Sequence, residues 1–131
     1  MATISGKVLI IDDSETVRSH LSSLVMRHGV AVATAADGRE GLAQLESPTD
    51  FGLVFVDVTM PHLDGIAMVE AVSEAFKKQG RTLPPIIMVT TESSRTIASR
   101  ARQAGARGWI VKPCTEDVID SLVVKFLKPA S

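Results

Sequence analysis

Five short runs of β-branched and aliphatic residues alternate along the chain with five stretches whose apolar residues recur at helical spacing. The runs cover residues 7–11, 30–34, 53–58, 86–90 and 109–111. They are apolar nearly throughout, a pattern typical of strands that are covered on both faces of a parallel sheet. Strands that alternate with helices predict a doubly wound α/β fold, here with five parallel strands and right-handed crossovers.

The boundaries of the helical stretches carry recognisable signals. We expect helices over residues 14–28, from 37 to Pro48, from 64 to Gly80, over 93–104 and from 115 onward. The second helix begins with a capping-box-like pair, Asp37 and Glu40, and Thr115 caps the fifth. The expected apolar stripe of the fifth helix is Val118, Leu122 and Phe126. The fourth offers only Ile97 and three alanines, which predicts a weakly anchored helix.

Length and composition limit the classes of protein that need be considered. The chain has 131 residues, 45% of them apolar and 22% charged, which is typical of one globular domain spanning 1–131. A net charge of -1 argues against nucleic acid or a membrane surface as the partner. No apolar run is long enough for a membrane span, and the N-terminus lacks a signal-peptide pattern, so we expect a cytoplasmic location. Cys114 is the only cysteine, which we interpret as an inert thiol.

Polar residues follow four of the five apolar runs, at the point where each run ends. Asp12 and Asp13 follow the first run, and Asp57, Thr90 and Lys112 mark the ends of the third, fourth and fifth. Because the carboxyl ends of parallel strands meet at one edge of the sheet, we expect these five side chains to lie together. Three neighbouring carboxylates repel one another unless a cation neutralises them. With oxygen ligands alone, the predicted cation is Mg2+, or Mn2+, and Asp57 is a candidate nucleophile for phosphoryl transfer.

These residues resemble the response-regulator receiver domains of two-component signalling, of which the chemotaxis response regulator is the simplest member. The resemblance extends over about residues 7–127, and four motifs carry it: VLIIDDS at 8–14, VFVDVTMPHLDG at 54–65, the strand-end Thr90, and WIVKP at 109–113. It implies the flavodoxin-like receiver fold with strand order 2-1-3-4-5.

The resemblance also implies a role for each site residue. Asp57 would be the phosphoacceptor, with Lys112 and Thr90 contacting the phosphoryl group. The implied metal ligands are Asp12, Asp13, Asp57 and the main-chain carbonyl of Thr59, with Asp12 acting largely through water. Thr90 and Trp109 would form the activation switch, Thr59 and Glu92 would tune the lifetime of the phosphoryl group, and the bond before Pro113 would be cis. Family members more often carry Tyr or Phe where this chain has Trp109.

Three other functions are compatible with parts of the pattern. A flavin or nucleotide enzyme needs a phosphate-binding loop rich in Gly, Ser or Thr after the first strand, where this chain has Asp12 and Asp13. An aspartate-based phosphohydrolase carries a second Asp two residues after its nucleophile, where this chain has Thr59. A degenerate receiver would bind partners without phosphorylation, and the intact acidic pair, Asp57, Thr90 and Lys112 count against it.

The sequence therefore predicts a phosphorylation-activated binding module that turns over no metabolite. Its expected partners are a histidine kinase or histidine phosphotransfer protein as phosphodonor, and a downstream target that binds the face of the fourth helix, fifth strand and fifth helix. Four arginines around the fourth helix predict a solvated face or a contact with an acidic partner: Arg95, Arg100, Arg102 and Arg107. His20, His28 and His62 lack metal-ligand spacing. The sequence leaves a role in chemotaxis or in a phosphorelay open.

Overall fold

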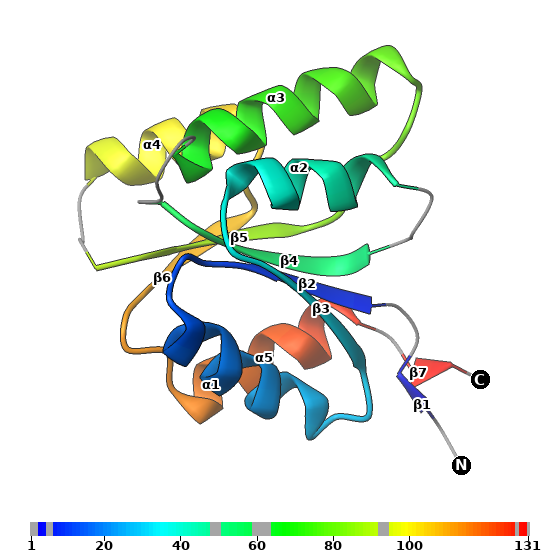
Figure 1. The fold of residues 1–131 in the computed structure, drawn as a ribbon, viewed down its shortest axis with the longest axis vertical. Helices are drawn as coiled ribbons and strands as arrows, with labels where there is room; N and C mark the ends of the chain where they lie inside the picture. Colours follow the sequence, from blue (N-terminus) through cyan, green and yellow to red (C-terminus); the bar gives the residue numbers. More distant parts are fainter. Residues whose placement is uncertain are drawn as a thin grey trace.

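A computed structural model of the chain describes residues 3–4, 7–47, 51–58, 64–91, 95–127 and 129–130. Its centre is a sheet of five parallel strands (Figure 1). The strands are β2 (Lys7–Ile11), β3 (Ala31–Ala35), β4 (Phe51–Asp57), β5 (Ile86–Thr90) and β6 (Gly108–Val111). They lie in the order β3-β2-β4-β5-β6. Numbered among themselves, these strands have the order 2-1-3-4-5, so the predicted fold class and strand order are confirmed.

Helices cover both faces of the sheet. One face carries α2 (Gly38–Glu46), α3 (Gly65–Lys78) and α4 (Arg95–Ala104), and the other carries α1 (Glu15–Met26) and α5 (Glu116–Phe126) (Figure 1). Within the described residues, no helix is both long and apolar enough to span a bilayer. The layered arrangement leaves the two ends of the sheet, where the connections run, as the places at which polar groups can gather.

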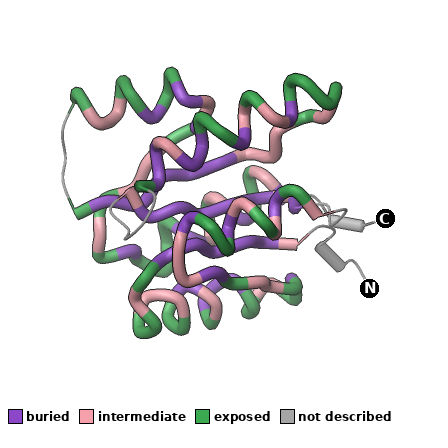
Figure 2. Tube along the Cα trace, turned by 45° about the horizontal axis from the view of Figure 1, so that its top comes forward, coloured by how far each residue is buried: buried purple, intermediate pink, exposed green. Residues whose placement is uncertain are grey.

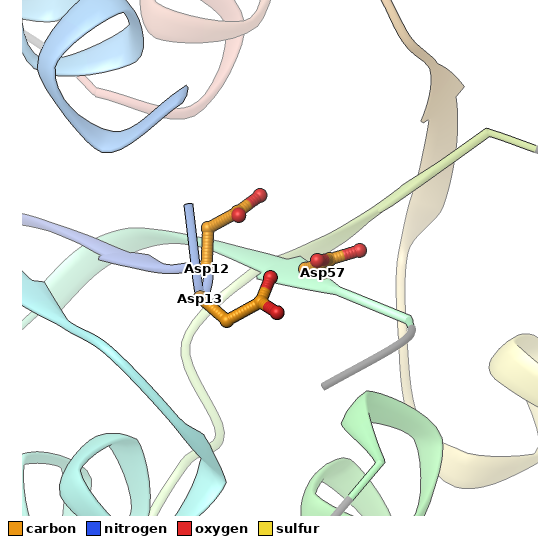
Figure 3. A group of neighbouring side chains, drawn as sticks. All are labelled: Asp12, Asp13 and Asp57. Carbon is orange, nitrogen blue, oxygen red and sulfur yellow. The ribbon is translucent and has the colours of Figure 1, made fainter. Parts of the chain in front are cut away.

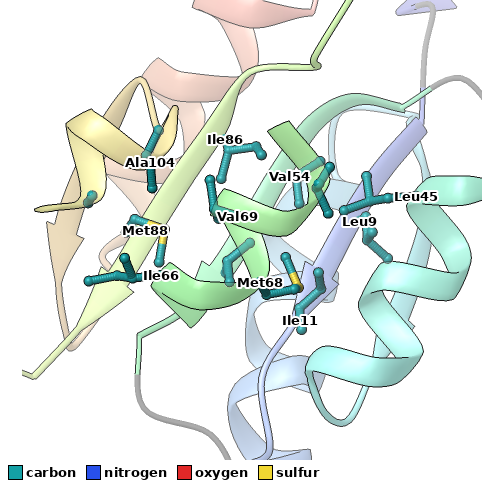
Figure 4. Close-up of a cluster of buried hydrophobic side chains, with 14 of the residues drawn as sticks. Leu9, Ile11, Leu45, Val54, Ile66, Met68, Val69, Ile86, Met88 and Ala104 are labelled. Atoms are coloured by element: carbon teal, nitrogen blue, oxygen red, sulfur yellow. The ribbon is translucent and has the colours of Figure 1, made fainter. Parts of the chain in front are cut away.

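Two apolar clusters form the core, one on each face of the sheet. Ile86 and Met88 of β5 point toward α3 and α4, whereas Ile87 and Val89 point toward α1 and α5 (Figure 4 shows the first cluster). The central strands β2, β4 and β5 are buried almost throughout (Figure 2). The edge strands β3 and β6 are half-buried or exposed at most positions, so the expectation of strands covered on both faces holds only for the centre of the sheet.

Side-chain caps begin four of the helices at the positions that the sequence indicates. Ser14, Asp37, Asp64 and Thr115 each accept a hydrogen bond from the backbone N–H three residues later. In the predicted capping box, the Glu40 carboxylate accepts from the N–H of Ala36, one residue before the cap. These bonds satisfy N–H groups that have no partner inside the helix.

The face that α5 turns toward the core differs from the predicted one. Ile119 and Val123 are fully buried, Leu122 and Phe126 are half-buried, and Val118 is 39% exposed. The prediction that Val118 is buried is therefore wrong. Because α5 carries apolar residues around much of its circumference, helical spacing alone does not fix its rotation, and the contacts with α1 decide it.

A second, two-stranded antiparallel sheet joins the ends of the chain. It pairs β1 (Thr3–Ile4) with β7 (Pro129–Ala130) and lies beside the two termini (Figure 1). These four residues fall outside the core of 7–127 that the sequence predicts, and their pairing was not anticipated.

Candidate functional site

The fold brings the strand-end residues of the sequence to one edge of the sheet. Asp12 and Asp13 follow β2, Asp57 ends β4, Thr90 ends β5, and Lys112 follows β6. The strands β2 and β4 are neighbours, and Ile11 pairs with Val56, so the acidic pair stands beside Asp57. After β2 the chain forms β3 on one side of β2 and then returns to form β4 on the other side. The gap between β2 and β4 is therefore the topological switch point, the place where doubly wound folds bind ligands.

Three carboxylates form an acidic cluster at this switch point (Figure 3). Asp12, Asp13 and Asp57 each offer an oxygen, and these oxygens all lie within 4.8 Å of one another. Asp12 and Asp57 are 1% and 6% exposed, whereas Asp13 is open to solvent. The Asp12 Oδ2 atom is buried, and the Lys112 ammonium lies 3.1 Å from it. Three carboxylates beside a single ammonium keep an excess of negative charge that fits a hard divalent cation, so the cluster is able to hold a metal ion.

Lys112 provides the positive charge of the site. Its Nζ lies 3.1 Å from Asp12 Oδ2 and 3.6 Å from Asp57 Oδ2. Burial is the largest single influence on the pKa of Lys112 and lowers it, but the two carboxylates together outweigh burial and raise the pKa above its usual value. The Lys112 N–H donates to the Thr90 carbonyl at 2.7 Å, and the peptide bond between Lys112 and Pro113 is cis. The ammonium is thus held, charged, over both carboxylates.

The backbone and side chains of the β2–α1 turn fix Asp12. Its Oδ1 accepts from the N–H of Ser14 at 2.9 Å, and its carbonyl accepts from Arg18 Nη1 at 2.6 Å. The Asp12 N–H donates to the carbonyl of Ala35 on the neighbouring strand. No motif in the sequence marks Arg18, because its contact is with a main-chain carbonyl and not with a side chain.

Thr90 and Trp109 lie on the same side of the sheet. Trp109 pairs with Met88 across β5 and β6, and Val111 pairs with Thr90, so alternation points Thr90, Met88 and Trp109 toward the α4 face. Thr90 is buried, and Trp109 is half-buried against the core cluster on that face. Thr90 therefore connects the acidic edge of the sheet to the layer that contains α4 and Trp109.

Gly65 brings the start of α3 against the strand that carries Asp57. A Cβ at this position would stand 2.1 Å from the Asp57 carbonyl oxygen and 3.0 Å from Val56 Cγ1. The Gly65 N–H donates to the carbonyl of Val58 at 2.9 Å. The contact of Gly65 with Asp57 has no signature in the sequence and appears only in three dimensions.

Three residues considered from the sequence lie outside the described part of the chain. They are Thr59, Glu92 and His62. Their roles remain predictions. The contacts of His20 and His28 are with other groups than the acidic cluster. His20 Nε2 lies 3.3 Å from the Cys114 carbonyl, and His28 Nε2 lies 2.7 Å from Asp120 Oδ1 of α5.

Comparison with known proteins identifies relatives over nearly the whole chain. The sequence profile described as "Response regulator receiver domain" matches residues 8–124. The chemotaxis protein CheY of Pseudomonas aeruginosa is 34% identical, with 93% of this chain and 96% of that protein covered. The transcriptional regulatory protein PdtaR of Mycobacterium tuberculosis is 38% identical over 86% of this chain, which spans about half (52%) of its length.

The solved structures agree with the sequence comparison. Vibrio cholerae CheY4 superposes with a TM-score of 0.80 at 34% identity, covering 92% of this chain and 98% of that one. The CheX–CheY–BeF3–Mg2+ complex of Borrelia burgdorferi contains a match with a TM-score of 0.82 at 29% identity, covering 95% and 92% of the two chains. Family profile, relatives and fold therefore agree, and the chain belongs to the response regulator receiver domain family, whose members act generally as signalling switches.

Proposed function

We propose that the chain is a phosphorylation-activated switch of a two-component system, in which Asp57 accepts a phosphoryl group from a histidine kinase or a histidine phosphotransfer protein. One observation carries this proposal: three carboxylates and an ammonium from separate segments converge at the switch point of the sheet, with Lys112 within 3.6 Å of Asp57. The site turns over no metabolite, because the acceptor is the protein itself.

The residues of the site supply most of what this transfer requires. An Asp57 carboxylate oxygen attacks the phosphorus, the bond from phosphorus to the donor breaks, and an acyl phosphate forms on the side chain. Lys112 places a fixed positive charge where the phosphoryl oxygens come to lie, and the Thr90 hydroxyl turns toward the phosphoryl group. Asp57 is largely buried, which limits access of water to the acyl phosphate.

Asp12, Asp13 and Asp57 would hold Mg2+, with the main-chain carbonyl of Thr59 as a further ligand and Mn2+ as an alternative ion. When bound, Mg2+ neutralises the acidic cluster and the charge on the phosphoryl oxygens. The convergence of three carboxylates, two of them buried, supports this assignment. The Borrelia relative was solved as a complex with BeF3 and Mg2+, which supports it independently.

Phosphorylation would change the surface formed by α4, β6 and α5. Among the described residues of α4, only Ala101 and Ala104 are fully buried, so little apolar area holds this helix to the sheet. Thr90 would move toward the phosphoryl group and Trp109 would follow inward, which shifts the population between two arrangements of this surface. A downstream protein that recognises one arrangement would read the signal.

Intact-protein mass spectrometry tests the proposal. The chain is incubated with acetyl phosphate, with and without Mg2+, as the wild type, as Asp57→Ala and as the control Asp117→Ala, which removes an exposed carboxylate of α5. We expect a Mg2+-dependent phosphoryl adduct in the wild type and the control and none in Asp57→Ala. A folded wild type that forms no adduct under any condition would instead indicate a degenerate receiver that binds partners without phosphorylation.

The lifetime of the adduct tests the two positions outside the described residues. Substitution of Thr59 or of Glu92 should change the rate at which the phosphoryl group is lost from Asp57, measured as the decay of the adduct after the donor is removed. Unchanged decay in both variants would contradict these two roles and leave the assignment of Asp57 intact.

A further inference from the structure

The end of the sheet opposite the acidic cluster contains a hollow that the proposed function does not use. The hollow lies where α2 and α3 end and where β4 begins, on the right-hand side of Figure 1. Phe51 begins β4 and lines the hollow, whereas Asp57 ends the same strand. At about 3.3 Å per residue the strand separates the two by roughly 20 Å. The hollow is therefore a separate place from the site of Asp57.

Apolar side chains from three elements form the inner wall of this hollow. Leu45 of α2, Phe51 of β4 and Phe76 of α3 line it and are 1%, 9% and 4% exposed. Leu83 and the two prolines that follow it close one side, and proline has a fixed φ angle. The wall is preformed, because its side chains belong to the core and the segment that closes it has little backbone freedom.

Two arginines provide the charge of the hollow. Arg81 and Arg107 both line it, and none of the described residues that line it is acidic. The Arg81 guanidinium lies over the Phe76 ring, 4.0 Å from its centroid. Its side-chain hydrogen bonds are long and go to neutral oxygens, 3.3 Å to Gln79 Oε1 and 3.5 Å to the Ser47 carbonyl. Neither arginine forms an ion pair within the described ranges, so these residues leave both charges unneutralised.

The main chain holds both arginines beside the hollow. The Arg81 N–H donates to the carbonyl of Phe76 at the end of α3, and the Arg107 N–H donates to the carbonyl of Ile86 on β5, each at 2.8 Å. The two guanidinium groups thus start from fixed backbone positions on different segments. A ligand that meets them has little loop ordering to offset, which favours binding.

The size and chemistry of the hollow define the ligand that it fits. Its volume is about 470 Å³, within the range of roughly 300–1,000 Å³ that is usual for small-molecule sites. The buried aromatic wall fits a flat apolar body, and a planar guanidinium fits a carboxylate through two parallel hydrogen bonds. An inorganic anion would leave the wall uncovered, and a cation would be repelled by the arginines.

We propose that this hollow binds a small organic anion with a flat apolar body, of the class of aromatic carboxylates. The carboxylate meets Arg81 and Arg107, and the ring packs against Phe51 and Phe76. The site is distinct from that of Asp57, and its occupancy requires neither Mg2+ nor phosphorylation.

Backbone amide resonances test the site, with β-naphthoate as the probe and with untreated protein in the absence of Mg2+ and phosphodonor. We expect saturable shifts that are largest at the amides of Phe51, Leu83 and Arg107, with a Kd of about 1 mM or lower. The neutral β-naphthamide and the cationic β-naphthylmethylammonium should bind at least about tenfold more weakly, because neither pairs with the arginines.

Three outcomes of this titration would overturn the proposal. They are the absence of saturable shifts, equal binding of β-naphthamide, and largest shifts beside α1 at Thr16 and Cys114, which line a different, apolar hollow. Because no phosphodonor is present, the result stands apart from the proposed function. A chain that forms no phosphoryl adduct would still bind β-naphthoate, and a chain that forms the adduct without binding β-naphthoate would refute this site alone.

Single substitutions locate the anion. Arg107→Gln removes the charge of an exposed side chain and should weaken β-naphthoate binding by about tenfold or more with little effect on folding. The matched control is Arg39→Gln, which changes the net charge equally but lies in the first turn of α2, whereas Leu45 lies near its end. It should change the affinity by less than about twofold. Equal affinities in these two variants would refute the role of Arg107 and with it the proposal.

Arg81 needs a graded pair of variants, since its side chain also contacts Ser47 and Phe76 and its loss could loosen the end of α2. Arg81→Lys keeps the charge without the planar fork, so it should weaken binding less than Arg81→Gln. Urea unfolding of each variant shows whether the fold is retained. Two folded Arg81 variants that both bind β-naphthoate as tightly as the wild type would contradict the assignment.

Discussion

Replacement of Gly65 by alanine tests whether the start of α3 and the end of β4 are in the close contact that the structure shows. The added Cβ would stand 2.1 Å from the Asp57 carbonyl oxygen, 2.9 Å from its carbonyl carbon and 3.0 Å from Val56 Cγ1. Ordinary contacts of this kind are longer than about 3.4 Å, so the helix and strand must separate by more than about 1 Å. Both obstructing atoms at Asp57 belong to the backbone and have no side-chain rotation that would relieve the clash.

The expected loss of stability combines two opposing effects. Overpacking in a close contact costs about 1–3 kcal/mol, and the higher helix propensity of alanine returns at most about 1 kcal/mol. We therefore expect Gly65→Ala to lower the free energy of unfolding by about 1–2 kcal/mol. Because the backbone of Asp57 must move with the strand, phosphorylation should slow by roughly 10- to 100-fold, since a shift of about 1 Å in a reacting group has effects of that size.

Urea unfolding and the rate of adduct formation measure the two effects. Gly108→Ala is the matched control, because a Cβ there would meet only Ile87 Cδ1 at 3.5 Å, an ordinary contact. If Gly65→Ala had the stability and phosphorylation rate of Gly108→Ala, the inferred contact between α3 and Asp57 would be wrong. A loss of stability with an unchanged rate would show that the contact supports the fold without positioning Asp57.

Three further predictions concern charge and burial at the site. Mg2+ at ten times its Kd should raise the free energy of unfolding by about 1.4 kcal/mol, as measured by urea titration. In Asp13→Asn the same Mg2+ concentration should give little of that gain, and an equal gain in the variant would exclude Asp13 as a ligand. Because the pKa of Lys112 is raised on folding, its contribution to stability is complete below the ordinary lysine pKa of about 10.4 and is lost as pH rises through the folded value. The metal-free wild type should therefore lose more stability than Lys112→Met as the pH rises above about 10.4, and parallel losses would refute this. Burial raises the pKa of the Cys114 thiol, so iodoacetamide should modify it at least about tenfold more slowly in the folded protein than in urea, whereas similar rates would show that the thiol is accessible.

The succession of strands and helices along the chain, and the residues that end them, were predictable from sequence. Each depends on the chemistry of residues that are close together in the chain. Apolar runs of β-branched residues and helical spacing mark each element, and Ser14, Asp37, Asp64 and Thr115 cap helices with their own side chains. Once the strands are parallel, their carboxyl ends must share an edge of the sheet. The convergence of the acidic pair, Asp57, Thr90 and Lys112 follows from that geometry alone.

The tertiary structure decided the features that depend on contacts between segments distant in sequence. Helical spacing left the rotation of α5 open, and packing against α1 buries Ile119 and Val123 while it exposes Val118. The same contact brings Glu116 against Arg27 and Asp120 against His28 of α1. The approach of Gly65 to the Asp57 carbonyl likewise has no signature in the order of residues, because a distance between two backbones is fixed only when the layers pack.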